Sequence, residues 1–321
     1  MTDQDSTRTP YVPNETAHPW RRFVAIGDSF TEGIGDPDPA HPGSHRGWAD
    51  RVAEVLAAQV DDFAYANLAV RGKLIAQIVA DQIEPAIALH PDLVSICAGG
   101  NDVIRPGTDP DAIASQLEDA VARLSSTGAA ILLFTGVDTA FTPVFRAFRG
   151  KVAIYNENVR AIAERHDCIV ADQWALKVVQ DMRFFDDDRL HYNALGHHEV
   201  ARMALRALNV PNDLEAMQPE PFPLRTWREA RSEDLGWARE HLVPWVLRRL
   251  RHQSSGDNLA AKRPDGCGTS RRETTSRRSA PTPRRCSFPS GTERVRPSST
   301  RARPRPLMPR SASPLPRSWG W

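Results

Sequence analysis

The chain has 321 residues, of which 40% are hydrophobic, so it is long enough for one large domain or two small ones and can bury a core. Its net charge of +1 hides a division, because residues 1–250 hold 25 Lys and Arg against 36 Asp and Glu, whereas residues 251–321 hold 16 against 4. The body is therefore acidic and the tail strongly basic. Four scattered cysteines, without the spacing of a zinc site, do not make a disulfide framework and predict reduced thiols in a cytoplasmic protein.

The N-terminal residues 1–21 are polar and contain no apolar core of a signal peptide. We expect them to form a flexible leader. Nowhere does the chain hold the run of about 20 apolar residues that a membrane-spanning helix needs, so we expect no membrane span.

Strands and helices alternate along the next part of the chain. Short apolar runs predict strands at 23–26, 63–70, 92–100, 129–135 and 168–172, and apolar residues at helical spacing predict helices at 48–60, 74–89, 111–124, 148–165 and 193–208. Alternation and continuously apolar strands favour an α/β domain over residues 22–210, with a mainly parallel five-stranded sheet between two layers of helices. In such sheets the working site lies at the carboxyl ends of the strands.

Two segments follow this domain. An amphipathic pattern within 225–250 predicts a C-terminal helix, packed on the domain, in an extension over residues 211–253. Residues 254–321 are rich in Arg, Pro and Ser and poor in apolar residues, which predicts disorder. Three interpretations of this tail are open: a binder of nucleic acid or another acidic partner, an inert extension, or an out-of-frame translation. Nucleic acid is the less favoured partner.

The first polar motif comes directly after the first strand, where Gly27-Asp28-Ser29 ends the apolar run. A serine at this turn lies at the mouth of the sheet, where its hydroxyl can act as a nucleophile and its N–H can face an oxyanion. The alternative is a plain turn in which Asp28 or Ser29 caps a helix.

Two further motifs follow the second and third strands. Gly72 allows the backbone to approach a ligand closely, although it can equally be an ordinary loop glycine. Asn101, within Gly99-Gly100-Asn101-Asp102, can donate from its side chain to an oxyanion, although the same four residues are good turn formers.

The fourth motif is Asp188-Arg189-Leu190-His191. A spacing of three lets the carboxylate of Asp188 orient the imidazole of His191 and stabilise its charged form. The alternative is a capping segment at a helix start. His197 and His198 lie in the helix that follows, and we expect them to face solvent or to pack.

Taken in order, GDS, a downstream Gly, GxND and DxxH make the region from Phe23 to Leu208 resemble the SGNH, or GDSL-type, hydrolase superfamily of serine esterases and lipases. The stretches FTEGIGD and WREARSEDLGWAREHLVPWVLRRLR are also similar to intracellular actinobacterial members. The resemblance implies a flavodoxin-like fold and ester hydrolysis without a metal or organic cofactor.

It also implies a role for each motif. Ser29 attacks the ester carbonyl, His191 is the general base and then the general acid, and Asp188 orients His191. The oxyanion hole is formed by the backbone N–H groups of Ser29 and Gly72 and by the side chain of Asn101.

The acyl group is less well defined by the sequence. Phe141 and Phe145 follow the fourth strand, which predicts that they line an acyl pocket or belong to a mobile lid; the alternative is that they fasten the next helix to the core. We expect a small-molecule ester with a short to medium acyl chain. Alternatives are an O-deacetylase or acyltransferase acting on a carbohydrate or small metabolite, and an inactive hydrolase-like domain with a nucleic-acid-binding tail. Oligomeric state does not follow from the sequence.

Overall fold

A computed structural model describes residues 18–223, 225–244, 247, 256 and 259–268. Its sheet has the strand order β5-β4-β3-β1-β2-β6, in which the first five strands run parallel. In the middle of the sheet, Phe23 of β1 is aligned with Tyr65 of β2 and Leu93 of β3. These five strands are β1 (Arg22–Gly27), β2 (Ala64–Asn67), β3 (Leu93–Cys97), β4 (Ala130–Phe134) and β5 (Ile169–Ala171).

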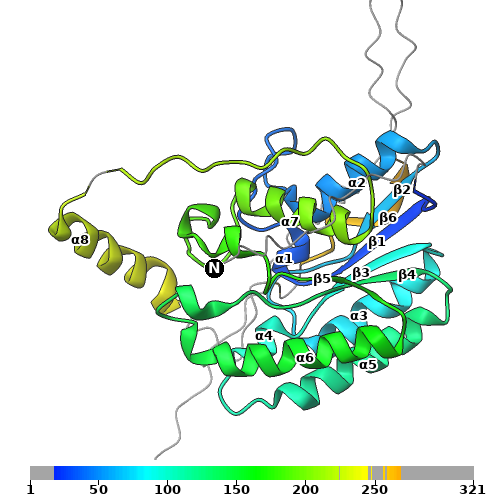
Figure 1. Cartoon of the computed structure of the whole chain (residues 1–321), viewed down its shortest axis with the longest axis horizontal. Coiled ribbons are helices and arrows are strands. Elements are labelled where there is room, and N and C mark those ends of the chain that lie inside the picture. Colours follow the sequence, from blue (N-terminus) through cyan, green and yellow to red (C-terminus); the bar gives the residue numbers. More distant parts are fainter. Residues whose placement is uncertain (1–17, 224, 245–246, 248–255, 257–258, 269–321) are drawn as a thin grey trace, which may run out of the picture. The chain divides into compact units, whose positions relative to one another are not determined.

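Helices cover both faces of this sheet (Figure 1). One layer contains α3 (Ile75–Ala88), α5 (Pro110–Ser125) and α6 (Arg149–Arg165), and the other contains α2 (Gly47–Gln59) and α7 (Ala194–Ala207). The predicted α/β sandwich with a mainly parallel sheet is confirmed.

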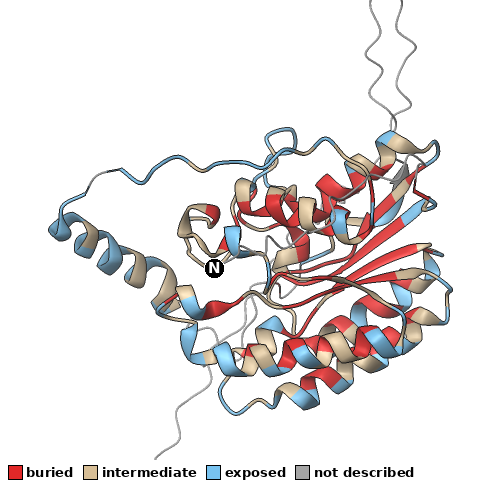
Figure 2. Ribbon diagram, viewed as in Figure 1, coloured by how far each residue is buried: buried red, intermediate tan, exposed pale blue. Residues whose placement is uncertain are grey.

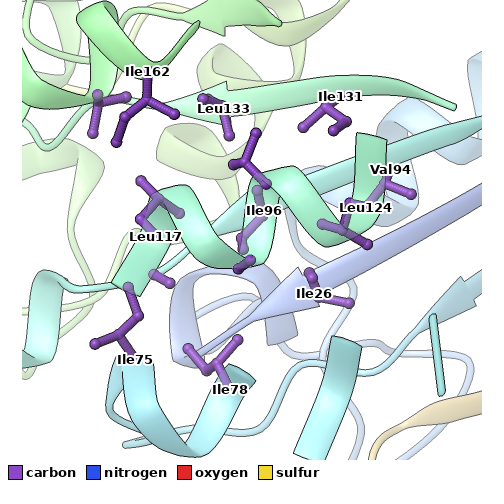
Figure 3. Close-up of a cluster of buried hydrophobic side chains, with 14 of the residues drawn as sticks. Ile26, Ile75, Ile78, Val94, Ile96, Leu117, Leu124, Ile131, Leu133 and Ile162 are labelled. Atoms are coloured by element: carbon purple, nitrogen blue, oxygen red, sulfur yellow. The ribbon is translucent and has the colours of Figure 1, made fainter. Parts of the chain in front are cut away.

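Each face of the sheet builds its own core, because side chains alternate along a strand. Val24 and Ile26 of β1 pack with the first helix layer, while Phe23 and Ala25 pack with the second. Figure 2 marks the strands as the most buried part of the fold. Figure 3 shows the first cluster closely, with Ile26 of β1 and Ile75 and Ile78 of α3 among its members. Burying each large aliphatic side chain contributes about 1.5–3 kcal/mol, so the two clusters hold the sheet rigidly.

The segment that follows α7 departs from the sequence expectation. A helix was expected to pack on the domain, and α8 (Trp227–Trp237) does form, continued by a π-helical turn at Ala238–Leu242. Yet no residue of α8 is buried, and Trp227 is 71% exposed. The expected packing is therefore limited to contacts near the end of α8, such as the hydrogen bond from Trp237 to the carbonyl oxygen of Asp188.

A sixth strand corrects the expectation of disorder from residue 254 onward. β6 (Arg263–Gly268) pairs antiparallel with the edge strand β2. Just before it, the Lys262 ammonium donates to the carbonyl oxygens of Glu32, His45 and Arg46 at 2.6–3.0 Å. Apolar composition could not predict this strand, because it is held by main-chain pairing with β2 and by the ion pair between Lys262 and Asp50. The rest of the predicted tail lies outside the described residues.

The predicted leader is also partly corrected. His18 is buried, and its ring nitrogen Nε2 lies 2.9 Å from the carbonyl oxygen of Leu56. Residues 1–17 lie outside the described residues. Among those described, no helix combines the length and the apolar character needed to cross a membrane.

Candidate active site

The candidate site lies where the sheet changes its winding direction. From β1 the chain moves to β2 on one side, and then crosses to β3 on the other side. Adjacent loops at such a switch point leave a crevice beyond the carboxyl ends of the strands. Ser29, Gly72 and Asn101 follow β1, β2 and β3, so strand order alone brings these three loops to one place.

Backbone close packing positions Ser29. Gly27 ends β1 with φ +149°, and a Cβ at this residue would lie 2.5 Å from the carbonyl oxygen of Cys97, so only glycine fits. Asp28 then caps the four-residue helix α1 (Ser29–Glu32) by accepting from the N–H of Phe30 at 3.1 Å. The buried Gln82 side chain accepts from the N–H of Gly27 at 2.8 Å and donates to its carbonyl at 2.9 Å.

Ser29, His191 and Asp188 form one hydrogen-bonded chain. The Nε2 atom of His191 lies 2.9 Å from the Oγ atom of Ser29, and its Nδ1 atom lies 2.6 Å from Oδ2 of Asp188. A carboxylate only accepts, so Nδ1 carries the proton and Nε2 accepts from the serine hydroxyl. The other Asp188 oxygen accepts from the N–H groups of Leu190 and His191, each at 2.9 Å, which orients the carboxylate.

A short turn between β5 and α7 presents His191. Phe185 and Tyr192 form an antiparallel bridge, and the N–H of Asp186 donates to the carbonyl of His191 at 2.8 Å. Asn193 caps α7 through its side-chain oxygen, while its amide nitrogen donates to the carbonyl of Phe185 at 3.0 Å. One asparagine thus joins the turn to the helix behind it.

The charge on Asp188 is held in place by its partners. Burial by itself would raise the pKa of Asp188, but the hydrogen bonds from His191 and the main chain outweigh it, and the pKa is lowered. The group is therefore a carboxylate at neutral pH and can stabilise an imidazolium. Burial raises the pKa of the nearby Cys97 thiol. The thiol therefore stays protonated at neutral pH and is a poor nucleophile.

The third predicted oxyanion donor already has protein partners. The Asn101 amide nitrogen donates to Oδ2 of Asp28 at 3.0 Å and to the carbonyl of Lys73 at 3.1 Å. It therefore joins the loops after β1, β2 and β3. Gly72, beside Lys73, has φ +74°, in the region that favours glycine.

An apolar pocket of about 180 Å³ lies beside this site. Both predicted substrate residues, Phe141 and Phe145, line it together with Phe185. It reaches Leu190 and Gly100, the sequence neighbours of His191 and Asn101. A wider groove of about 1,360 Å³ shares the Phe145 and Phe185 walls and extends to α8.

The remaining predicted histidines are not part of the site. His197 is fully buried, with Nδ1 accepting from the N–H of Trp48 and Nε2 donating to the carbonyl of Ile34 at 3.0 Å. His198 lies 2.8 Å from the carbonyl of Glu215. Within the part of the chain that the structure describes, no three His, Cys, Asp or Glu residues gather as a metal site would require.

Sequence reasoning missed three residues that support the site: Glu32, Gln82 and Trp237. Gln82 could have been noticed, because it interrupts the apolar face of α3 four residues after Ile78, and a buried polar group needs partners. Trp237 donates from Nε1 to the carbonyl of Asp188 at 3.1 Å. That contact joins segments 49 residues apart, and no local pattern predicts it.

Comparison with known proteins supports the fold. Solved structures with the same fold include LAE5, an alpha/beta hydrolase enzyme from the metagenome of Lake Arreo, Spain, at 23% identity and a TM-score of 0.51, covering 63% of this chain and 99% of that one. A catalytic mutant of Axe2, an acetylxylan esterase from Geobacillus stearothermophilus, aligns at 22% identity and a TM-score of 0.50, covering 63% and 100%. No curated protein sequence matches the chain.

The family assignment comes from the sequence itself. Residues 25–199, more than half of the chain, match the GDSL-like lipase/acylhydrolase family. This span begins within β1 and ends in α7, so it contains the loops that carry Ser29, Gly72, Asn101 and His191. The chain belongs to the GDSL-like lipase/acylhydrolase family, and it is an esterase of the SGNH type.

Proposed function

We propose that the protein hydrolyses carboxylic esters of short to medium acyl chains through an acyl-enzyme on Ser29. The observation that carries this proposal is the continuous hydrogen-bonded chain from Ser29 through His191 to Asp188, placed at the switch point of the sheet. A serine hydroxyl is a weak nucleophile by itself, and an adjacent base held by a carboxylate is the usual way to activate it.

In the first half of the reaction the Oγ atom of Ser29 attacks the ester carbonyl carbon, and its proton moves to Nε2 of His191. The imidazolium that forms is stabilised by Asp188, and it then gives the proton to the departing alkoxide. In the second half His191 takes a proton from water as the water oxygen attacks the acyl carbon. His191 then returns this proton to the Oγ atom of Ser29 as the bond between Oγ and the acyl carbon breaks and the acid leaves.

The negative charge on the carbonyl oxygen needs preorganised donors. We assign the backbone N–H groups of Ser29 and Gly72 and the Asn101 side chain to this role; one such donor lowers the barrier by about 3 kcal/mol. Because the Asn101 amide also donates to Asp28 and Lys73, the oxyanion must share or replace one of these acceptors. A developing full negative charge competes well with a neutral carbonyl for the same N–H.

Pocket size supports the acyl-chain assignment. An apolar cavity of about 150 Å³ is enough for a benzene ring, so a pocket of about 180 Å³ has room for an acyl chain of about six carbons. Its walls, which include Phe141, Phe145 and Phe185, offer apolar contact to the chain. A palmitoyl chain exceeds this volume and would have to leave the pocket.

The test is hydrolysis of p-nitrophenyl esters from acetate to palmitate by the wild type, Ser29→Ala and Phe145→Ala. We expect the highest kcat/KM near butyrate or hexanoate, and no activity in Ser29→Ala. Phe145→Ala enlarges the pocket, so its optimum should move to longer chains. Activity that survives in Ser29→Ala would contradict the mechanism, and an unchanged profile in Phe145→Ala would contradict the pocket assignment.

The carbohydrate or metabolite alternative is tested by changing the alcohol part of the ester, which leaves in the first half of the reaction. Release of acetate from acetylated oligosaccharides, at rates above those for p-nitrophenyl butyrate, would favour a deacetylase. Equal or slower release keeps the simple esterase assignment.

A further inference from the structure

One buried carboxylate outside the Ser29–His191–Asp188 chain connects two parts of the site. Glu32 is only 8% exposed and is the last residue of α1, the helix that begins with Ser29. Its Oε2 atom accepts from the backbone N–H of Arg71 at 2.6 Å, and its Oε1 atom accepts from the Arg71 guanidinium at 3.0 Å. A carboxylate is costly to bury unless it is paired and hydrogen-bonded, and here both conditions are met.

Arg71 immediately precedes Gly72, so Glu32 holds the peptide unit next to the predicted oxyanion donor. On the other side of Gly72, the carbonyl of Lys73 accepts from Asn101 at 3.1 Å. Gly72 is therefore fixed between two anchors, one on the loop after β1 and one on the loop after β3. Gly72 has φ +74°, a left-handed conformation that glycine adopts without strain because it has no Cβ.

The anchor on the Ser29 side is itself secured. The carbonyl of Glu32 accepts from the Lys262 ammonium at 2.6 Å, so the C-terminal end of α1 is held while its side chain holds Arg71. Ser29 and Gly72 thus belong to two segments that one side chain joins directly.

Building on the proposed function, we propose that Glu32 is a positioning residue for the oxyanion hole, which sets the Gly72 N–H relative to the Ser29 hydroxyl through Arg71. It touches neither substrate nor the reacting atoms. Its carboxylate is needed because it accepts at once from the main-chain N–H and from the side chain of Arg71, which fixes both the position and the rotation of that peptide.

The experiment compares Glu32→Ala and Glu32→Gln with the wild type in hydrolysis of p-nitrophenyl butyrate and in inhibition by butylboronic acid. This boronate forms a charged tetrahedral adduct on a serine, so its affinity reports the oxyanion hole directly. A shift of about 1 Å in a catalytic group costs about 100-fold in rate, which is the fall in kcat expected for Glu32→Ala. KM should stay within about twofold, because the ground-state ester needs less from the oxyanion hole.

The boronate inhibition constant should rise in parallel with the fall in kcat. Glu32→Gln should recover part of both losses, since its amide oxygen still accepts from the Arg71 N–H. The matched control is Asp36→Asn, which removes another buried ion pair, to Arg51, in the loop that follows α1. It should lower the melting temperature with little change in kcat or in boronate affinity.

A purely structural role for Glu32 would make its variants behave like Asp36→Asn, and that result overturns the proposal. If Glu32→Ala does not fold, Glu32→Gln alone tests the proposal, through whether its kcat and its boronate affinity fall in parallel. Ser29→Ala is measured in parallel. Should it keep its activity, the proposed function fails first; should it lose activity while the Glu32 variants keep theirs, only the positioning role fails.

Discussion

Two histidines six positions apart have opposite environments. His191 lies in a turn with 21% of its side chain exposed, between a hydroxyl and a carboxylate that share its two ring nitrogens. His197 lies inside α7 with no exposed surface, between one main-chain N–H and one main-chain carbonyl. A carboxylate partner favours the charged imidazole, whereas burial against neutral groups favours the neutral one. The first arrangement suits proton transfer, and the second fastens α7 to the loop after α1.

The burial of His197 predicts how stability depends on pH. Burial lowers the pKa of His197 from 6.5 to about 4. As the pH falls below 6.5 the unfolded chain binds a proton that the folded chain does not, so the free energy of unfolding falls, by up to about 1.4 kcal/mol per pH unit, until about pH 4. Above pH 7.5 this contribution is constant.

His197→Gln should therefore cost most stability at pH 7.5 and least at pH 4.5. Urea unfolding at several pH values measures the difference. His198→Gln, on the same helix, should leave the pH dependence of the wild type in place. A difference between wild type and His197→Gln that stays constant with pH would contradict the assignment.

At the scale of elements, α8 and the turn before α7 support each other at the edge of the site. Trp237 donates to the carbonyl of Asp188, and the Arg189 guanidinium lies 4.8 Å from the centre of the Trp237 ring while it pairs with Asp234 at 2.8 Å. These contacts hold the main chain of Asp188, whose side chain orients His191. A helix with little buried surface is thus connected to the Ser29–His191–Asp188 chain through a few polar and ring contacts.

Trp237→Phe keeps an aromatic ring at this position and removes the hydrogen bond from Nε1 to the carbonyl of Asp188. One hydrogen bond contributes about 1 kcal/mol, so kcat should fall about fivefold if the bond holds Asp188 in its reactive position. The measurement is the kcat of p-nitrophenyl butyrate hydrolysis. Trp227→Phe, at the exposed start of the same helix, should match the wild type. Equal kcat values in all three proteins would show that the Trp237 hydrogen bond does not affect the reaction rate.

At the scale of the whole molecule, the core domain and the presence of α8 were predictable, but β6 and the contacts of α8 were not. Strand and helix spacing predicted the five parallel strands. Because Ser29, Gly72 and Asn101 each follow a strand, the sequence also placed them at the same edge of the sheet. β6 escaped prediction because its segment has almost no apolar residues. The Glu32–Arg71 pair escaped prediction because it joins residues 39 apart. Charged residues in a sequence are usually interpreted as exposed to solvent, so neither residue indicated a buried pair.

Lys262 allows a test of how firmly the C-terminal strand belongs to the domain. Its side chain is 12% exposed, and its ammonium pairs with the buried Asp50 at 2.5 Å. Lys262→Met leaves Asp50 buried beside fewer partners, which should lower the free energy of unfolding by about 3 kcal/mol. Adding Asp50→Leu removes the orphaned charge, so the double variant should recover most of the loss. Urea unfolding measures both, and a neutral single variant would contradict the role of Lys262.

The position of β6 at the edge of the sheet also has a consequence for synthesis. β2 is complete when residue 67 has been made, but the strand that covers its edge ends at residue 268. At about 5–20 residues per second a ribosome needs about 10–40 s to make the roughly 200 residues between them. Throughout that time the nascent domain carries an open edge able to pair with a neighbouring chain. Ribosome-associated chaperones are therefore expected to bind the nascent protein until β6 emerges.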